Sequence, residues 1–216
     1  MPITKKDIIK SIEEAKNNSK KRGFSQSVDL IVVLKEIDVK KPENRINELI
    51  ELPTAPSKDV KVGIFASGDL ALRAEKAGVD KVFNKETIDG ILNDKKNARK
   101  LVKGIDVFLA EASFMPLIGR AFGQILGPKG KMPTPIPPTA PIETIIEQSR
   151  KKIRVRIRDQ LNTQCKVGTE DMDNEIIAEN VQAVFNRLER KLEKGLKNIH
   201  EAYIKTTMGS PIKIKI

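Results

Sequence analysis

Residues 116–138 read PLIGRAFGQILGPKGKMPTPIPP. The first half spaces its apolar side chains as an amphipathic helix does, at Leu117, Ile118, Phe122, Ile125 and Leu126. We expect this helix to break at Gly127-Pro128 and a rigid, irregular loop to follow, because prolines cannot donate hydrogen bonds to a helix or a sheet. Lys129 and Lys131 flank Gly130, where the backbone can approach a partner closely. Gly127, Lys129, Gly130 and Lys131 are therefore candidate contact residues; the alternative is a proline-rich surface linker with solvated lysines.

Strands and helices alternate around this segment. We expect strands at 60–66, 81–83 and 105–110, with helical segments near 69–77, 87–92, 98–102 and 142–152. Alternation with short loops predicts a small parallel sheet covered by helices, a Rossmann-like α/β domain over residues 61–152. The turn Ser67-Gly68-Asp69 lacks the glycines of a dinucleotide loop, so we interpret it as a capped structural turn.

The two ends of the chain have a different pattern. Thr4 is expected to cap a first helix, and strands are expected at 28–39 and 45–52, joined as a hairpin by a turn at 40–44. After the second crossing, residues 153–158 alternate apolar side chains with arginine and are expected to re-enter the first sheet. A strand at 163–167, a long helix at 173–195 and two last strands near 200–204 and 212–216 follow. Residues 1–60 and 153–216 thus predict an α+β domain with an antiparallel sheet built from both chain ends, into which the α/β domain is inserted.

Composition limits the classes of function. The 216 residues carry a net charge of +11, with pI near 9.6, and no part of the chain is acidic, which favours a polyanionic partner. One cysteine, Cys165, rules out an internal disulfide framework, and one histidine, His200, makes a Cys/His zinc site or a Ser-His-Asp triad implausible. No apolar run is long enough for a membrane span and no signal-peptide core is seen. We expect no catalysis, no cofactor, no metal and no membrane partner.

Two segments have the composition of RNA contacts. In the first, Lys20-Lys21-Arg22 precedes Gly23, Phe24 and Ser25-Gln26-Ser27, which together offer charge for phosphates, a ring for stacking and polar groups for bases or ribose. The alternative is that Phe24 is a core ring and the cations are a solvated helix end. In the second, Thr206-Thr207-Met208-Gly209 offers hydroxyls and an exposable thioether in a tight turn before the last strand.

Two cationic groups are less specific. Arginines 154, 156 and 158 could grip a phosphate backbone or be a solvated sheet face, and the cluster of Lys95, Lys96, Arg99, Lys100 and Lys103 is a candidate secondary contact surface.

The run GRAFGQILGPKGKMPTP resembles the hallmark loop of the large-subunit ribosomal protein one family, the universal stalk protein beside the tRNA exit site. The resemblance extends to RGFSQSVDLIVVLKEIDVKKPENRI, VGTEDM and the C-terminal TTMG turn, and it is closest to archaeal-type members. It implies a cytoplasmic, ribosome-bound protein that is monomeric off the ribosome, without enzymatic activity.

The resemblance also implies a site and partners. The residues expected to bind ribosomal RNA are Phe24, Ser27, Asp29, Gln164, Val167, Gly168, Thr169, Thr207, Met208 and Gly209. The same residues are expected to bind a mimic site in the protein's own messenger and so repress its translation, and the loop with Gly127, Lys129, Gly130 and Lys131 is expected to contact RNA or the exit-site tRNA.

Two other functions stay open at this point. A small α/β enzyme acting on a phosphorylated metabolite or nucleotide would need a phosphate loop and a general base, and neither stands out. A repressor that acts on messenger RNA alone and never joins a ribosome would use the same residues as the leading hypothesis.

Overall fold

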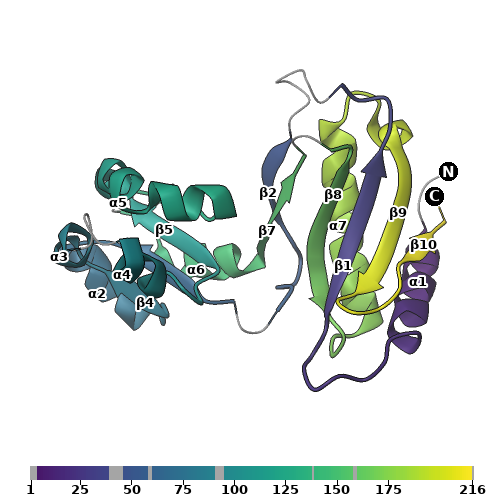
Figure 1. The fold of residues 1–216 in the computed structure, drawn as a ribbon, viewed down its shortest axis with the longest axis horizontal. Coiled ribbons are helices and arrows are strands. Elements are labelled where there is room, and N and C mark those ends of the chain that lie inside the picture. The colour runs from purple at the N-terminus through teal and green to yellow at the C-terminus, as the bar shows by residue number, and fades with distance from the viewer. Residues whose placement is uncertain are drawn as a thin grey trace. The chain divides into compact units, whose positions relative to one another are not determined.

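The computed structural model describes residues 4–38, 46–57, 60–90, 95–137, 139–157 and 160–215. The chain forms two compact units, an outer unit of residues 1–58 and 151–216 and an inner unit of residues 59–150 (Figure 1). The domain bounds expected from the sequence lie two residues away from these. Each unit has its own hydrophobic core, so each is described by itself.

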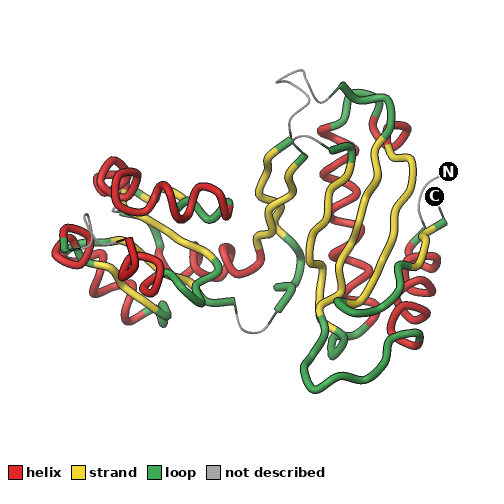
Figure 2. Tube along the Cα trace, in the orientation of Figure 1, coloured by secondary structure: helices red, strands yellow, loops and turns green. Residues whose placement is uncertain are grey.

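An antiparallel sheet covered on one face by helices forms the body of the outer unit (Figures 1 and 2). Its strands are arranged in the order β10-β9-β1-β8, and its helices are α1 (Lys5–Asn17) and α7 (Asn174–Lys191). The strands are β1 (Ser27–Leu34), β8 (Asn162–Thr169), β9 (Ile199–Thr206) and β10 (Ile212–Ile214), and a 3-10 turn, η3 (Gly195–Asn198), precedes β9. This confirms the predicted antiparallel sheet, although α7 ends before Gly195 and β8 continues through Gly168.

Burial alternates along the strands of this sheet. In β1, the side chains of Val28, Leu30, Val32 and Leu34 are buried, whereas those of the intervening residues are partly exposed. α1 is capped as predicted, since the Thr4 hydroxyl accepts a hydrogen bond from the Asp7 amide, and α7 begins after Asp173. The buried side chains of the sheet pack against these two helices. The opposite face of the sheet is therefore open.

The predicted hairpin is wrong. β2 (Asn47–Glu51) pairs with β7 (Lys152–Arg156) as a separate two-stranded antiparallel sheet. Both edges of β1 are already occupied, by β8 and β9, so β2 cannot pair with β1. The expectation that residues 153–158 re-enter the first sheet is also wrong, because β7 pairs with β2 outside the four-stranded sheet. The alternation predicted for β7 is present, with Ile153 and Val155 buried and Arg154 exposed; the turn at 40–44 and Arg158 lie outside the described residues.

The inner unit is a parallel sheet in the order β4-β3-β5-β6, which confirms the Rossmann-like prediction (Figure 1). Its strands are β3 (Val62–Phe65), β4 (Lys81–Phe83), β5 (Val107–Glu111) and β6 (Thr134–Ile136). Its helices are α2 (Gly68–Lys76), α3 (Lys85–Asp89), α4 (Lys95–Leu101), η2 (Ala112–Phe114), α5 (Met115–Lys129) and α6 (Ile142–Lys151). Two apolar clusters hold it together, and one of them contains the packed rings of Phe65, Phe83, Phe108 and Phe122.

The break predicted at Gly127-Pro128 is also wrong. α5 continues through Pro128 to Lys129 and ends at Gly130, whose φ of 69° is left-handed. The amides of Gly130 and Lys131 donate to the carbonyls of Gly127 and Leu126, which closes the helix as a Schellman motif. In place of an irregular loop, the proline-rich sequence then forms β6, where Pro135 is tolerated because β6 is an edge strand.

Candidate nucleic-acid interface

Three segments far apart in the sequence meet at one end of the antiparallel sheet. Since neighbouring strands run in opposite directions, the start of β1 lies beside the ends of β8 and β9, with Ser27 opposite Thr169 and Val28 opposite Thr206. The segment 18–26 leads into β1, the segment 170–173 follows β8, and the turn 207–211 follows β9. The structure thus brings together both RNA-like segments that the sequence indicated.

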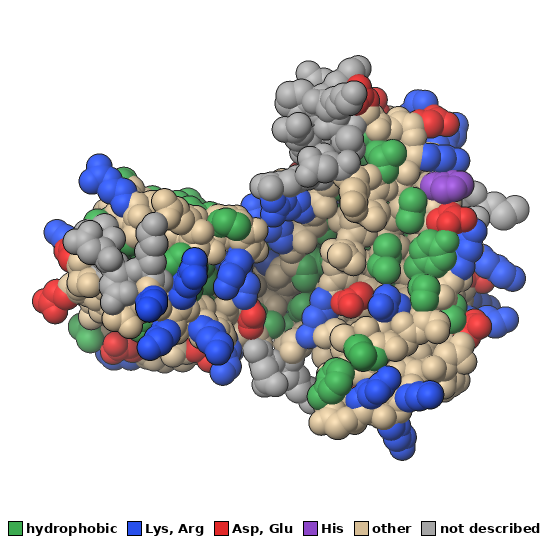
Figure 3. Space-filling view, viewed as in Figure 1, with side chains coloured by type: hydrophobic (Ala, Val, Ile, Leu, Met, Phe, Trp, Pro, Cys, Tyr) green, Lys and Arg blue, Asp and Glu red, His purple; other side chains and the backbone are tan. Residues whose placement is uncertain are grey.

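Two large apolar side chains are exposed at this end of the sheet. Phe24 is 52% exposed and Met208 is 61% exposed, so the alternative that Phe24 is a core ring is wrong. The exposed Lys20, Lys21 and Arg22 come shortly before Phe24 in the chain. Figure 3 shows hydrophobic and basic side chains gathered at this end of the outer unit, at its lower edge in the view. An exposed ring and thioether beside cations are suited to unpaired bases and phosphates.

The turn that carries Met208 is attached to the start of β1. The Thr207 amide donates to the Ser27 carbonyl at 3.0 Å, and the Ser27 amide donates to the Thr207 hydroxyl at 3.0 Å. The Gly209 amide donates to the carbonyl of Thr206 at 3.1 Å. Thr206 itself is fully buried and its hydroxyl donates to the Ser19 hydroxyl at 3.1 Å, so of the two threonines only Thr207 reaches the surface.

Asp29 and Gln164 lie on the open face of the sheet. Asp29 stands between Lys166 and Lys205 of the neighbouring strands, and Gln164 is exposed two residues away from Lys166 on β8. Partial burial raises the pKa of Asp29, while Lys205 and Lys166 oppose that rise. This face offers an acceptor, an amide and two cations next to the exposed ring and thioether.

Val167, Gly168 and Thr169 are less accessible. A bulge places Val167 out of register, because Val28 pairs with Gly168 and Asp29 pairs with Lys166. The side chain of Val167 is fully buried and its carbonyl accepts from Asn180 at 2.8 Å. Gly168 is buried against Ile177, and only Thr169 is partly exposed. These residues shape the end of β8, and Thr169 alone among them presents a side chain there.

Sequence reasoning grouped Gln26 with Ser25 and Ser27 as groups for RNA, but Gln26 is 1% exposed. It bonds to Glu170, which lies in the VGTEDM run but was not among the expected contact residues. Ser25 in turn donates to the carboxylate of Asp171. The role of the carboxylates of residues 170–171 is thus what sequence reasoning missed, since only the fold brings them to the start of β1.

The second candidate site belongs to the inner unit. Gly127 and Lys129 lie in the last turn of α5 and Gly130 ends the helix, with Lys129 exposed. Lys131 donates to the Ile105 carbonyl at 2.7 Å and pairs with Asp106 at 3.2 Å. Lys131 is therefore held by protein groups, and Lys129 is the cation of this set that an approaching anion meets first.

No enzymatic site stands out in the part of the chain that the structure describes. The crevice at the carboxyl ends of the parallel strands holds about 640 Å³ and is lined by Ser67, Asp69, Leu70, Arg73, Glu111 and Thr139. Ser67 does not cap α2 as predicted; its hydroxyl donates to Glu111 at 3.1 Å, and Asp69 pairs with Arg73 at 2.8 Å. Two carboxylates in this crevice repel a phosphate.

The described residues also give little support to thiol, histidine or metal chemistry. Burial raises the pKa of the Cys165 thiol to about 12, so this cysteine is inert, and His200 is exposed on β9. Within the described ranges there is no cluster of potential metal ligands and no helix long and apolar enough to cross a membrane.

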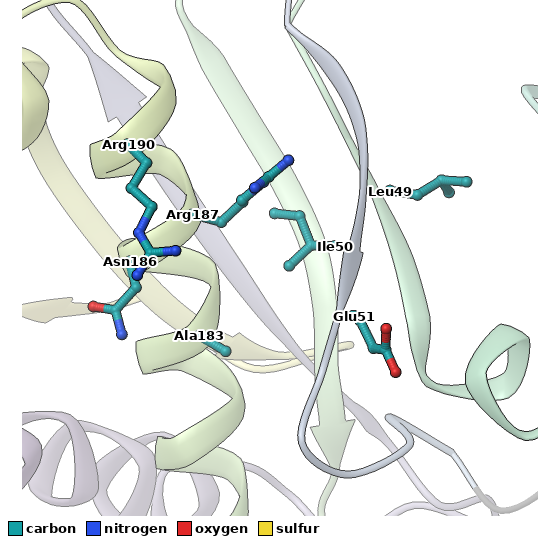
Figure 4. Close-up of a pocket in the computed structure, with 7 residues that line it drawn as sticks. All are labelled: Leu49, Ile50, Glu51, Ala183, Asn186, Arg187 and Arg190. Atoms are coloured by element: carbon teal, nitrogen blue, oxygen red, sulfur yellow. The ribbon is translucent and has the colours of Figure 1, made fainter.

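A shallow pocket of the outer unit lies between β2 and α7. It is lined by Leu49, Ile50, Glu51, Ala183, Asn186, Arg187 and Arg190 and holds about 340 Å³. Figure 4 shows Asn186 and the two arginines on α7 and Glu51 on β2, with Leu49 pointing away from α7. Arg187 is already paired with Glu48 at 2.9 Å, and no set of groups converges on a ligand position.

Comparison with known proteins decides the family. A model of the Ribosomal protein L1p/L10e family matches residues 14–210, which includes both units. The chain belongs to this family. Among L1p/L10e relatives, each named large ribosomal subunit protein uL1, that of Methanocella arvoryzae is 45% identical over 98% of this chain and all of its own length. The uL1 of Archaeoglobus fulgidus is 44% identical over 99% of this chain and all of its own, and that of Thermofilum pendens is 47% identical over 94% and 91%. These relatives confirm the resemblance to archaeal-type members.

Proposed function

We propose that this chain is a structural, non-catalytic constituent of the large ribosomal subunit that binds ribosomal RNA at the mobile stalk by the tRNA exit site. Membership of the L1p/L10e family supports the ribosomal role. The observation that carries the RNA-binding role is the joint exposure of Phe24 and Met208 beside a run of cations. We name this end of the sheet the terminal-turn surface, made of Phe24, Ser27, Asp29, Gln164, Thr169, Thr207, Met208 and Gly209.

The chemistry of the terminal-turn surface suits a folded RNA with unstacked bases. A flat ring and a thioether can lie on the faces of bases or riboses, and each stacked base is worth about 1–3 kcal/mol. Polar groups such as Gln164 and Thr169 can recognise base edges or 2′-hydroxyls, which distinguish RNA from DNA. The net charge of +11 speeds the encounter and adds affinity that falls with salt.

The same surface supports a second proposed role. A segment of the protein's own messenger that presents the same shape would compete with the ribosomal site, and its occupation would repress translation. We further propose that Lys129 and Gly130 at the end of α5 contact RNA or the exit-site tRNA, and that the protein is a cytoplasmic monomer until it joins the ribosome.

Binding and co-sedimentation test this function. The affinity of the wild-type protein for a stalk RNA fragment is measured against an unrelated duplex of equal length, over a series of salt concentrations. We expect a preference for the stalk fragment of at least about 1,000-fold, which is typical of specific nucleic-acid binding. Equal affinity for both RNAs would contradict the proposal and leave only nonspecific attraction.

Co-sedimentation separates the ribosomal role from a messenger-only repressor. The proposal expects the protein to pellet with large subunits that were stripped of it, and to be displaced by excess stalk fragment. Binding to a messenger fragment without any association with large subunits would favour the repressor. Tight, saturable nucleotide binding by an RNA-free preparation would instead favour the small α/β enzyme.

A further inference from the structure

One buried side chain bonds to all three segments of the terminal-turn surface. The amide nitrogen Nε2 of Gln26 donates to the Ser19 hydroxyl at 2.8 Å, the Lys20 carbonyl at 3.2 Å and Oε2 of Glu170 at 3.2 Å. Its oxygen Oε1 accepts the backbone amide of Met208 at 3.2 Å. The segment before Phe24, the segment after β8 and the turn with Met208 are thus joined through one amide group.

The backbone of Gln26 adds to this junction. Its amide donates to Oε1 of Glu170 at 2.9 Å, and the Glu170 amide donates to its carbonyl at 2.9 Å. The Glu170 carboxylate therefore holds both the main chain and the side chain of Gln26. Because Gln26 is only 1% exposed, water can replace these hydrogen bonds only if the junction opens.

The partners also fix the chemistry required at this position. The Lys20 carbonyl and the Glu170 carboxylate can only accept, while the Met208 amide can only donate, so the side chain must carry both a donor and an acceptor. Glutamate in place of Gln26 would lose the donor and set a second negative charge against Glu170. A methionine would match the volume but leave buried polar groups unpaired.

We propose that Gln26, held by Glu170, is the positioning residue of the terminal-turn surface. It sets where Met208 and Phe24 stand relative to each other, and it touches no RNA itself. RNA recognition by shape depends on that spacing, because two anchors must meet their bases together. The inference rests on the proposed RNA-binding function and assigns the specificity of the surface to the hydrogen-bonded pair of Gln26 and Glu170.

Three protein variants and one matched control test the proposal. Gln26→Met removes the hydrogen bonds at nearly constant volume. Gln26→Glu keeps the acceptor for Met208 but opposes Glu170, and the double variant Gln26→Glu with Glu170→Gln exchanges the two groups at unchanged net charge. The control is Asn198→Leu, at the other end of β9: this amide is 2% exposed and also joins two loops, accepting from the Lys194 amide at 2.8 Å and donating to the Lys35 carbonyl at 3.1 Å.

For each full-length variant, the affinities for stalk fragment and unrelated duplex are measured together with urea stability. We expect Gln26→Met and Gln26→Glu to lower stalk affinity by about tenfold or more, with duplex affinity within about twofold of wild type. The exchanged double variant should recover part of the affinity lost in Gln26→Glu, since the new amide at position 170 can donate to the carboxylate at position 26, whereas the Lys20 carbonyl stays without its donor. Asn198→Leu should lose stability but keep stalk affinity.

Three outcomes would overturn the positioning role. These are wild-type stalk affinity in Gln26→Met, an equal loss in Asn198→Leu, and no recovery in the double variant. If Gln26→Met does not fold, the comparison between Gln26→Glu and the double variant remains, and these two differ only by Glu170→Gln. Failure of the wild type to prefer the stalk fragment would reject the proposed function itself, so the two failures are distinguishable.

Discussion

Replacing Gly209 by alanine should damage the turn that carries Met208. A Cβ atom at position 209 would lie 2.2 Å from the hydroxyl oxygen of Thr206, well inside the 3.0 Å that real Cβ contacts respect. The left-handed backbone conformations that require glycine are not involved here, since Gly209 is outside that region. The cost is therefore a packing cost, and the contact must open by about 0.8 Å.

The surroundings of Thr206 decide how large that cost is. Thr206 is fully buried, and its hydroxyl donates to Ser19 at 3.1 Å. Rotating the hydroxyl away loses this hydrogen bond, worth about 0.5–1.5 kcal/mol, and moving the turn instead strains the backbone by about 1–3 kcal/mol. We expect Gly209→Ala to lower the free energy of unfolding of the outer unit by about 2 kcal/mol.

Urea denaturation followed by circular dichroism measures this loss, with a companion variant and a matched control. Thr206→Ala removes the clashing atom, so Gly209→Ala should cost about 1 kcal/mol less in that background than in the wild type. Gly23→Ala is the control, since its Cβ meets nothing within 4 Å; it should be neutral or slightly stabilising. An unchanged stability in Gly209→Ala, or an equal cost in both backgrounds, would refute the packing argument.

Three further predictions concern the core and the sheet of the outer unit. Cys165 should resist a thiol reagent at pH 8 in the native protein and react at once in urea, because burial raises its pKa to about 12; rapid native labelling would contradict this. Asp29→Asn should be at least as stable as wild type at neutral pH, because the raised pKa of Asp29 in the folded state makes the stability of the wild type fall as the pH rises above 3.8. In urea titrations, the free energies of unfolding of the two proteins should become equal near pH 3. A wild type that is more stable than the variant at neutral pH would contradict this prediction. Gly168→Ala would place its Cβ 2.9 Å from Cγ1 of Ile177 and should lower the free energy of unfolding by about 1–3 kcal/mol. The loss should be smaller in an Ile177→Ala background, which lacks Cγ1, and an equal loss in both backgrounds would contradict the clash.

The sequence predicted well those parts of the fold that depend on local periodicity. Strict alternation in β7, and strand–helix alternation in the inner unit, follow from which side chains must be buried. Pairing partners are not local. β2 follows β1 closely enough in the chain for a hairpin, yet both edges of β1 pair with strands more than a hundred residues away. Only the assembled sheet shows these pairings.

Proline and glycine end helices and strands less often in this chain than its sequence suggested. Pro128 lies in the last turn of α5, so its missing amide removes only one backbone hydrogen bond before the helix ends at Gly130, and Pro135 lies in an edge strand. At the site, the exposed Phe24 and Met208 were found from the sequence, whereas the junction at Gln26 was not. A glutamine flanked by serines reads as a surface residue, and its burial depends on Glu170 arriving from the end of β8.

The most direct test of the terminal-turn surface compares two substitutions that introduce the same charge at equally exposed apolar side chains. Met208→Asp alters the surface, and Leu72→Asp, 59% exposed on α2 against 61% for Met208, is its matched control. The affinity of each for the stalk fragment is measured at one salt concentration beside the wild type. The account predicts that Met208→Asp binds about 10- to 100-fold more weakly, the worth of a stacked base, while Leu72→Asp stays within about threefold. Equal losses in the two variants, or none in either, would contradict the claim that RNA is recognised at this turn.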